Sequence, residues 1–267
     1  MAEDIGPGDI TTALTPSDAL TSAVVTLKQD ALICGIAWFE EAFRQLDHTI
    51  GFDWSCQDGD RRKNGAEVCT LYGATQAILT GERTALNFLQ TLSATATAAR
   101  KFVDTVAGTG ATILDTRKTI PGLRSAQKYA VRCGGASNHR IGLFDAILIK
   151  ENHILAIGSI DGAIKKARTS TESTLVEVEV ETMAQIERAL GSSTDRLLLD
   201  NLSLQMMCEA VRLRDRRAPE KKLEASGGIS IDNVRAIAET GVDYVSVGVI
   251  TKSVDAIDFS LRIIQGA

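Results

Sequence analysis

The stretch TLVEVEVETMAQIERALGSSTDRLLLDN, residues 174–201, contains two short apolar runs on either side of a segment with helical periodicity. The two runs, TLVEVEVE (174–181) and RLLLDN (196–201), have the length of strands. The segment TMAQIERAL (182–190) begins at Thr182, a residue type that caps helix N-termini, and is followed by a glycine. The stretch therefore predicts a strand–helix–strand unit, in which parallel strands are covered by a helix.

The same alternation extends along the chain from residue 111 to residue 248. The other runs with the length of strands are ATILDT (111–116), FDAILIK (144–150), KLEASG (222–227) and VDYVSVG (242–248). Helical segments separate most of these runs, and we expect a seventh short strand near residues 136–141. This number of strands suits an α/β barrel better than a doubly wound sheet, because no Gly-x-Gly-x-x-Gly turn follows any strand. An open sheet is the alternative.

The first part of the chain has a mixed pattern, which changes near residue 105. SAVVTLKQDALICG (22–35) predicts strand structure, and IAWFEEAFRQL (36–46) predicts an amphipathic helix. VCTLYGATQAILTG (68–81) predicts two short strands, and the residues that follow, 82–108, predict a long helix. We therefore expect a separate N-terminal domain over residues 1–105 and a barrel domain over 106–251.

Composition bounds the class of protein. The 267 residues are 44% hydrophobic and 24% charged, which is ordinary for a globular protein. A net charge of −5 and only 4% aromatic residues argue against a partner that is nucleic acid or a membrane surface. The five cysteines are scattered without a Cys-x-x-Cys pair, and no apolar run approaches the ~20 residues of a spanning helix. We therefore expect a cytoplasmic protein.

Positive charge is concentrated in DTRKTIPGLRSAQKYAVRCGGASNHR, residues 115–140, which holds seven basic side chains if histidine is included. Arg117 and Lys118 come directly after a predicted strand, whereas Lys128 and Arg132 fall within a predicted helix, where we expect them to face solvent. A chain of net negative charge with such a stretch predicts a local anion-binding site.

Polar residues follow most of the predicted strands at their carboxyl ends, the face on which α/β barrels build active sites. They are Arg117, Lys118, Lys150, Glu177, Glu179, Glu181, Asp200, Asn201, Ser226, Gly227, Gly228 and Gly248. One charged residue at a strand end is usually an exposed rim residue, but five strands with such ends favour a shared site.

Each of these groups has a simpler interpretation. The three glutamates of VEVEVE could form an exposed stripe on an edge strand, whereas a Glu and an Asp on adjacent strand ends would suit Mg²⁺. Lys150 could be a rim lysine. The glycines of ASGGIS and VSVGV could belong to ordinary turns, or could offer backbone N–H groups to a phosphate. His139 could be a structural histidine, but its place in the basic stretch favours contact with a ligand.

Eight motifs together resemble the bacterial quinolinate phosphoribosyltransferase family over nearly the whole chain. In order, they are EDIGPGDITT, GERTALNFLQTLSATAT, DTRKTIPGLRSAQKYAV, GGASNHRIGLFDAILIKENH, VEVEVE, LLLDN, EASGG and TGVDYVSVG. The resemblance implies an N-terminal α/β sandwich domain, followed by an incomplete, seven-stranded, TIM-like α/β barrel. It also implies that the C-terminal segment 252–267 returns to the first domain, and that the protein is a homodimer.

The resemblance also implies roles for particular residues. The residues implied to bind substrates are Arg83, Thr116, Arg117, Lys118, His139, Arg140, Lys150, Glu179, Asp200, Ser226, Gly227, Gly228, Val247, Gly248 and Val249. Lys150, Glu179 and Asp200 are implied to be catalytic, and the two carboxylates are implied to handle the ribose and Mg²⁺. Arg83 is expected to reach the site of the partner subunit.

The implied reaction joins quinolinate to phosphoribosyl pyrophosphate (PRPP) with Mg²⁺, and gives nicotinate mononucleotide, pyrophosphate and CO₂ for NAD biosynthesis. No organic cofactor is expected, because the ribosylated ring nitrogen can itself stabilise the carbanion that CO₂ leaves at C2. Within the same fold, the alternatives are the molybdenum-associated paralogue and a transferase acting on nicotinate, but a pocket with both Lys118 and Arg140 favours a dicarboxylate. Outside this class, Lys150 could form a Schiff base in a lyase, or the barrel could bind anions without catalysis.

Overall fold

The computed structural model describes residues 1–170 and 174–264, which form two compact units. One unit consists of Met1–Ala98 and the C-terminal segment from Val254 onward, and the other of Ala99–Ser253. Most of the segment expected to return to the first domain is therefore part of that unit, while residues 265–267 of it lie outside the described residues. In the part of the chain that is described, no helix is long and apolar enough to span a membrane.

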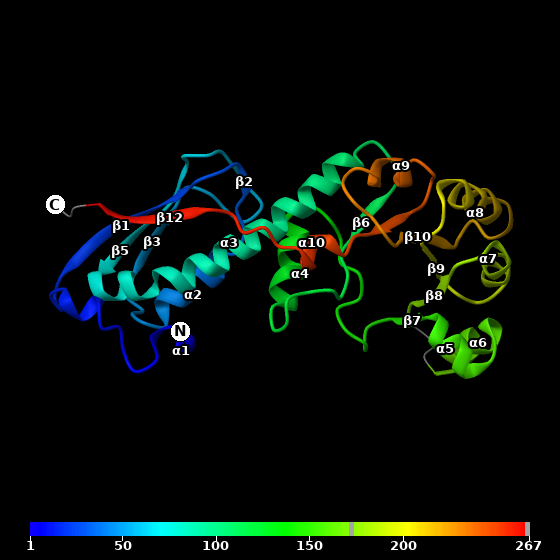
Figure 1. Cartoon of the computed structure of the whole chain (residues 1–267), viewed down its shortest axis with the longest axis horizontal. Helices are drawn as coiled ribbons and strands as arrows, with labels where there is room; N and C mark the ends of the chain where they lie inside the picture. The colour runs from blue at the N-terminus through cyan, green and yellow to red at the C-terminus, as the bar shows by residue number, and fades with distance from the viewer. Residues whose placement is uncertain (171–173, 265–267) are drawn as a thin grey trace. The chain divides into compact units, whose positions relative to one another are not determined.

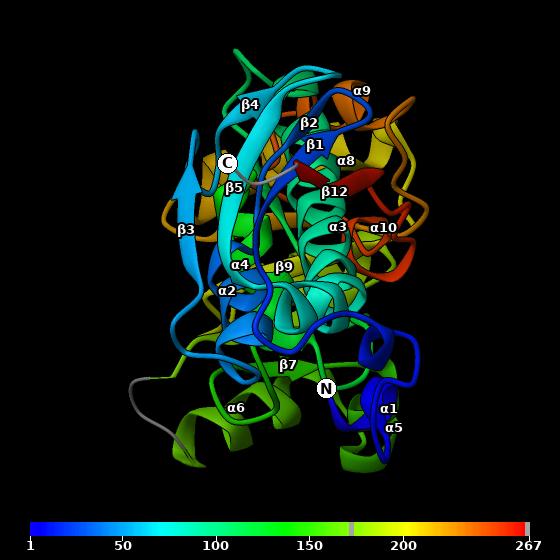
Figure 2. The ribbon, with the colours of Figure 1, turned by 90° about the vertical axis from the view of Figure 1, so that its left-hand side faces the viewer.

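The N-terminal unit contains a four-stranded antiparallel sheet with the strand order β12-β1-β5-β3 (Figures 1 and 2). Its elements are α1 (Ala2–Ile5), a 3₁₀ turn (Thr12–Leu14), β1 (Leu20–Leu27), β2 (Ala31–Leu32), α2 (Ile36–Arg44), β3 (Gly51–Trp54), β4 (Arg61–Arg62), β5 (Glu67–Ala74), the first part of α3 (Thr75–Thr105), which continues into the second unit from Ala99, and β12 (Phe259–Ile264). Alternate residues of β1, such as Val25 and Leu27, pack in one core with α2 and the first half of α3. The predicted helix over residues 36–46 is confirmed.

The expectation of a second strand within residues 68–81 is wrong, because α3 begins at Thr75. The short apolar run there can be read as strand or helix, and only the continuation through Ile78 and Leu86 shows its helical spacing. Gly81 looks like a stop signal but lies inside the helix. A side chain there would overlap the ring of Phe43, so this glycine permits close packing of α2 and α3.

The second unit is a parallel α/β barrel that is incomplete, which confirms the predicted fold class. Its elements are β6 (Thr112–Leu114), α4 (Arg124–Cys133), β7 (Ile147–Ile149), α5 (Glu151–Ile157), α6 (Ile160–Ser170), β8 (Val176–Val180), α7 (Met183–Leu190), β9 (Arg196–Asp200), α8 (Leu204–Arg217), β10 (Lys222–Ser226), α9 (Val234–Ala238), β11 (Tyr244–Ser246) and α10 (Val249–Lys252). The strand order β6-β11-β10-β9-β8-β7 pairs the first strand with the last, as closure of a barrel requires. The seventh strand expected near residues 136–141 is reduced to one bridge, between Leu114 and Ser137.

Residues 174–201 form the predicted strand–helix–strand unit of β8, α7 and β9. Thr182 caps α7 by accepting a hydrogen bond from the backbone N–H of Gln185. The valines of β8 are fully buried against the helical layer, where α7 and α8 cover the outer face of the sheet (Figure 1). The intervening Glu177 and Glu179 therefore point to the barrel interior, not outward as an exposed stripe.

Candidate active site

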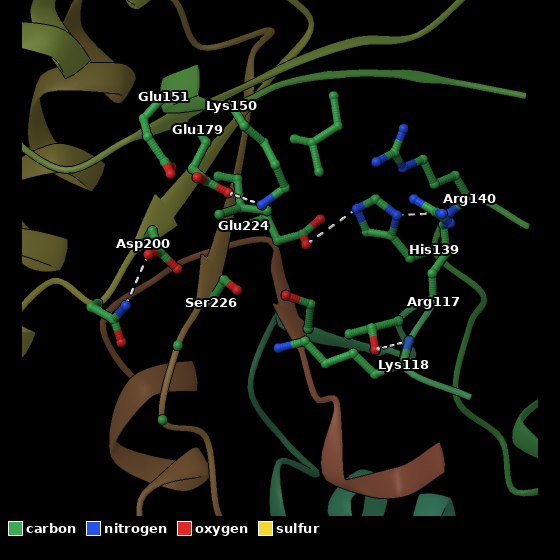
Figure 3. A pocket seen from close by; sticks show the side chains of 17 residues that line it. Arg117, Lys118, His139, Arg140, Lys150, Glu151, Glu179, Asp200, Glu224 and Ser226 are labelled. Atoms are coloured by element: carbon green, nitrogen blue, oxygen red, sulfur yellow. Dashed lines mark hydrogen bonds and ion pairs between the residues drawn. The ribbon is translucent and has the colours of Figure 1, made fainter. Parts of the chain in front are cut away.

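A cavity of about 670 Å³ lies at the carboxyl ends of the barrel strands (Figure 3). The predicted site residues that line it are Thr116, Arg117, Lys118, His139, Arg140, Lys150, Glu179, Asp200, Ser226, Gly227 and Gly228. The lining residues that were not named from the sequence are Leu148, Glu151, Leu198, Glu224 and Ser246, and Asn201, named only as a residue at a strand end, also lines the cavity. The predicted residues outside the lining are Arg83, Val247, Gly248 and Val249. Arg83 belongs to α3 in the N-terminal unit, and its side chain is 59% exposed.

One part of the cavity is strongly basic. Arg117 and Lys118 follow β6, and Arg140 follows the bridge at Ser137, so the fold brings together both ends of the basic stretch. Burial and the positive charge of Arg117 lower the pKa of the half-buried Arg140. Two guanidinium groups held close enough to repel each other form a site that is suited to an anion.

Lys128 does not face solvent as expected. It is only 3% exposed, and its Nζ donates to Asp115 Oδ1 at 2.6 Å and to the carbonyl oxygen of His139 at 2.8 Å. The Asp115 carboxylate also accepts from Asn138 Nδ2 (2.7 Å) and from the backbone N–H of His139 (2.8 Å). The helical pattern of the sequence could not reveal this buried partner. The pair joins the end of β6 to the segment that carries Arg140, while Arg132 on the same helix is exposed as predicted.

His139 lines the cavity, but both of its ring nitrogens bind the protein. Nδ1 accepts a hydrogen bond from the backbone N–H of Arg140 at 2.7 Å, so the ring proton lies on Nε2. Nε2 is 3.1 Å from Glu177 Oε2 and 3.4 Å from Glu224 Oε1. Burial lowers the pKa of His139 and so favours the neutral form of the imidazole. In this geometry the ring supports the backbone at Arg140 and offers no free nitrogen to a ligand.

Two buried carboxyl groups lie beneath the ring of His139. Glu177 and Glu224 are both fully buried, and Arg196 Nη1 is 2.9 Å from Glu224 Oε2. Burial, together with the negative charge of Glu177, raises the pKa of Glu224 to about 7. The guanidinium of Arg196 stacks over the ring of Tyr244 at 4.2 Å. Glu224 was missed as a site residue, although its two-residue spacing from Ser226 on one strand could have indicated it.

The other part of the cavity is acidic and contains Lys150. Glu179, from β8, accepts from Lys150 Nζ at 2.5 Å, and Asp200 stands at the end of the adjacent strand, β9. Burial raises the pKa of Glu179, although the ammonium of Lys150 opposes this shift. Asp200 Oδ2 accepts from the side-chain amide of Asn201 at 2.8 Å. This part therefore offers carboxylate oxygens and one ammonium group to a ligand.

Two glycine-containing loops complete the site. Ser226, Gly227 and Gly228 follow β10, and the space beside Gly228 is open, since no atom lies within 4 Å of an added Cβ. Gly248 follows β11 without lining the cavity itself. An added Cβ at Gly248 would lie 3.2 Å from Lys118 Cδ, so this glycine lets the basic part pack against the second loop.

The chain is similar to proteins of known family along both units. The model of the quinolinate phosphoribosyl transferase N-terminal domain matches residues 9–93, and that of the C-terminal domain matches residues 95–262. A carboxylating nicotinate-nucleotide pyrophosphorylase of Mycobacterium leprae is 41% identical, over 98% of this chain and 93% of that protein. A probable enzyme of the same name from Bacillus subtilis is 39% identical, over 98% of this chain and 90% of that protein. The structure of the nicotinate-nucleotide pyrophosphorylase of Francisella tularensis matches with a TM-score of 0.95 and 45% sequence identity, over 98% of this chain and 92% of that one.

Proposed function

The chain belongs to the quinolinate phosphoribosyltransferase family, and from this premise we propose how the barrel cavity carries out its reaction. The protein transfers the phosphoribosyl group of PRPP to quinolinate with loss of CO₂, a reaction of de novo NAD biosynthesis. The observation that carries the assignment of the site is that one cavity has a basic part and an acidic part (Figure 3). A small dianion and PRPP can therefore be held side by side.

The basic part is the proposed quinolinate site. The guanidinium forks of Arg117 and Arg140 can each bind a carboxylate in a bidentate manner, and Lys118 adds a point charge. His139 supports the backbone of Arg140 from behind. The three cations offset the repulsion between quinolinate and the even more negative PRPP.

The acidic part is the proposed ribose site. Loss of pyrophosphate leaves positive charge on the ribose, which the carboxylates of Glu179 and Asp200 can stabilise. The ion pair with Lys150 orients Glu179 and favours its ionised form, against the effect of burial. The loops at Ser226 and Gly248 are proposed to bind phosphate through their backbone N–H groups.

The donors in this part fit Mg²⁺ bound together with PRPP. Mg²⁺ is usually held by one or two carboxylates, with phosphate oxygens and water as the other ligands, and Glu179 and Asp200 are carboxylates at adjacent strand ends. The ion would neutralise charge on the departing pyrophosphate. No group in the proposed pathway requires an organic cofactor.

Decarboxylation then follows from the chemistry of the substrate. Once C1 of the ribose has bonded to the pyridine nitrogen, this nitrogen is cationic and can stabilise the electron pair that CO₂ leaves on C2. A proton from water then bonds to C2 and gives nicotinate mononucleotide. Arg117 and Arg140 need only hold the ring in place while the C2–carboxylate bond breaks. The protein thus contributes orientation and electrostatics, and the intermediate serves as its own electron sink.

The other activities considered from the sequence are less compatible with the site. A Schiff-base lyase needs a neutral lysine, whereas Lys150 is paired with Glu179 at 2.5 Å. A transferase for a monocarboxylate such as nicotinate would not require three cations. A barrel that only binds anions would have no use for the carboxylates at the ribose site.

We also propose a cytoplasmic homodimer, in which Arg83 completes the site of the partner subunit. Arg83 is exposed on α3, where another chain could contact it, and the scattered cysteines without a Cys-x-x-Cys pair suit a reducing compartment. Inactive Arg83→Ala and Lys150→Ala proteins would be unfolded together and refolded. Partial recovery of activity is expected, because a mixed dimer has one intact site, and no recovery would argue against sharing.

The test of the main function is direct. Protein, quinolinate, PRPP and Mg²⁺ are mixed, and both CO₂ and nicotinate mononucleotide are measured; nicotinate replaces quinolinate in a parallel reaction. Equimolar release of both products from quinolinate alone is expected. Folded protein that releases neither, or that prefers nicotinate, would contradict the proposal. Borohydride reduction with a carbonyl substrate should leave Lys150 unmodified.

A further inference from the structure

Asn201 has a backbone conformation that sets it apart from its neighbours. Its φ is 53°, and it is the one residue other than glycine with a positive φ among residues 1–170 and 174–264. Asparagine tolerates this left-handed region better than most residues, but the conformation persists only where the surroundings enforce it. Such outliers are concentrated at functional sites, and Asn201 lines the cavity.

The contacts of Asn201 join two parts of the site. Its Nδ2 donates to Asp200 Oδ2 at 2.8 Å, and its backbone N–H donates to the carbonyl oxygen of Ser226 at 2.9 Å. One residue thus binds both the carboxylate at the end of β9 and the loop that follows β10. Figure 3 shows Asp200, the partner of this amide, on the opposite side of the cavity from Arg117 and Arg140.

Gly227 fits closely against this residue. A Cβ added at Gly227 would overlap the side-chain oxygen of Asn201 and would lie 3.0 Å from its backbone nitrogen. The loop can therefore lie in this position only because residue 227 has no side chain. The left-handed backbone of Asn201 and the absence of a side chain at Gly227 together allow the two residues to pack closely.

We propose that Asn201 is a positioning residue, which holds Asp200 and the Ser226–Gly228 loop in the one arrangement that binds PRPP. This inference rests on the proposed function. The amide fixes one oxygen of Asp200 and so sets the direction of its carboxylate toward the ribose. The backbone hydrogen bond to Ser226 keeps the loop at a fixed distance from that carboxylate. Quinolinate binding, which uses residues on the other side of the cavity, should not depend on Asn201.

The test uses Asn201→Gly, which keeps the left-handed backbone free of strain and removes only the side chain. We expect PRPP affinity, measured by calorimetry with Mg²⁺, to fall about 10–100-fold, the range found when a supporting contact to a ligand-binding group is lost. The dissociation constant of quinolinate should stay within about twofold, and Tm should be unchanged or higher. Calorimetry measures PRPP binding without turnover. A wild-type protein without activity would therefore contradict the proposed function, whereas the effect of Asn201→Gly on PRPP affinity would still test the role of Asn201.

A double-mutant cycle separates positioning from direct contact with substrate. If Asn201 acts through Asp200, Asn201→Gly should have little further effect on PRPP binding in an Asp200→Ala background. Full additivity would show that Asn201 acts independently, and would overturn the proposal. Wild-type PRPP affinity in Asn201→Gly would overturn it as well. Equal losses for both substrates, accompanied by a lower Tm, would show a purely structural role and would also refute it.

Discussion

Replacement of Lys128 by methionine tests the buried ion pair that joins the two basic segments of the site. Methionine keeps the apolar stem but removes the ammonium group that donates to Asp115 and to the carbonyl oxygen of His139. Loss of one partner of a buried pair costs about 3–5 kcal/mol. Asp115 keeps two N–H donors, from Asn138 and His139, so we expect the lower end of this range, about 3 kcal/mol. For a unit of this size, that loss lowers Tm by about 6–12 °C.

The assay can follow each unit separately. The two tryptophans, Trp38 and Trp54, belong to the N-terminal unit, so their fluorescence reports its unfolding, whereas circular dichroism also reports the helices of the barrel. We expect the dichroism transition to shift more than the tryptophan transition. The deficit should shrink at low pH, because burial already raises the pKa of Asp115 and a protonated carboxyl needs no counter-charge.

The matched control is Arg132→Met on the same helix, whose exposed side chain should change stability by less than about 0.5 kcal/mol. Asp115→Asn combined with Lys128→Met should recover most of the loss, because no unpaired charge is then buried. Equal stability of the Lys128 and Arg132 variants would refute the buried pair.

Three further predictions concern the cavity. Arg117→Ala or Lys118→Ala should weaken quinolinate binding by about 10–100-fold, which corresponds to the loss of one charged hydrogen bond, and should leave Tm unchanged. Near-normal quinolinate affinity by calorimetry would show that these side chains do not bind quinolinate. Asp200→Asn should lower kcat much more than it weakens quinolinate binding, and steady-state kinetics with an unchanged kcat would exclude Asp200 from the mechanism. Folding raises the pKa of Glu224 to about 7, from an unfolded value near 4.3, so the folded state binds this proton more tightly. The stability that the protonated Glu224 contributes is therefore present at low pH and is lost as pH rises from about 5 to about 7.5. Urea titrations should show this decline, up to about 3 kcal/mol, in the wild-type protein and not in Glu224→Gln, and parallel profiles would contradict it.

The alternation of runs and helices predicted parallel strands covered by helices, because strands that are buried on both faces give short, mostly apolar runs; it favoured a barrel and left an open sheet as the alternative. The same logic located the site, since residues that follow parallel strands must meet at one edge. Thr182 and Asp200, for example, are both where the pattern places them. The expected roles of the individual residues await the experiments above.

The errors have a common physical origin, which is that contacts distant in sequence leave no local pattern. Nothing near Lys128 shows that Asp115 lies beneath it, and nothing near Gly81 shows that the ring of Phe43 packs there. The contacts of His139 with Glu177 likewise arise only when the strands close into a barrel. Local periodicity therefore predicts elements and their ends more reliably than it predicts the burial of a single polar side chain.

The three glutamates of the VEVEVE segment (176–181), two in β8 and one just after it, lie in three different chemical environments. Glu177 is sealed in the interior, Glu179 borders the cavity, and Glu181 is exposed to solvent, with about 7 Å between successive members. Deleting one residue from this strand would turn the remaining carboxylates toward the helices and put valine in the cavity. Homologous enzymes should therefore vary in length only in the loops beyond β8, or by even numbers within it. For a protein engineer, a single-residue insertion or deletion in this strand would therefore exchange its buried and cavity-facing side chains.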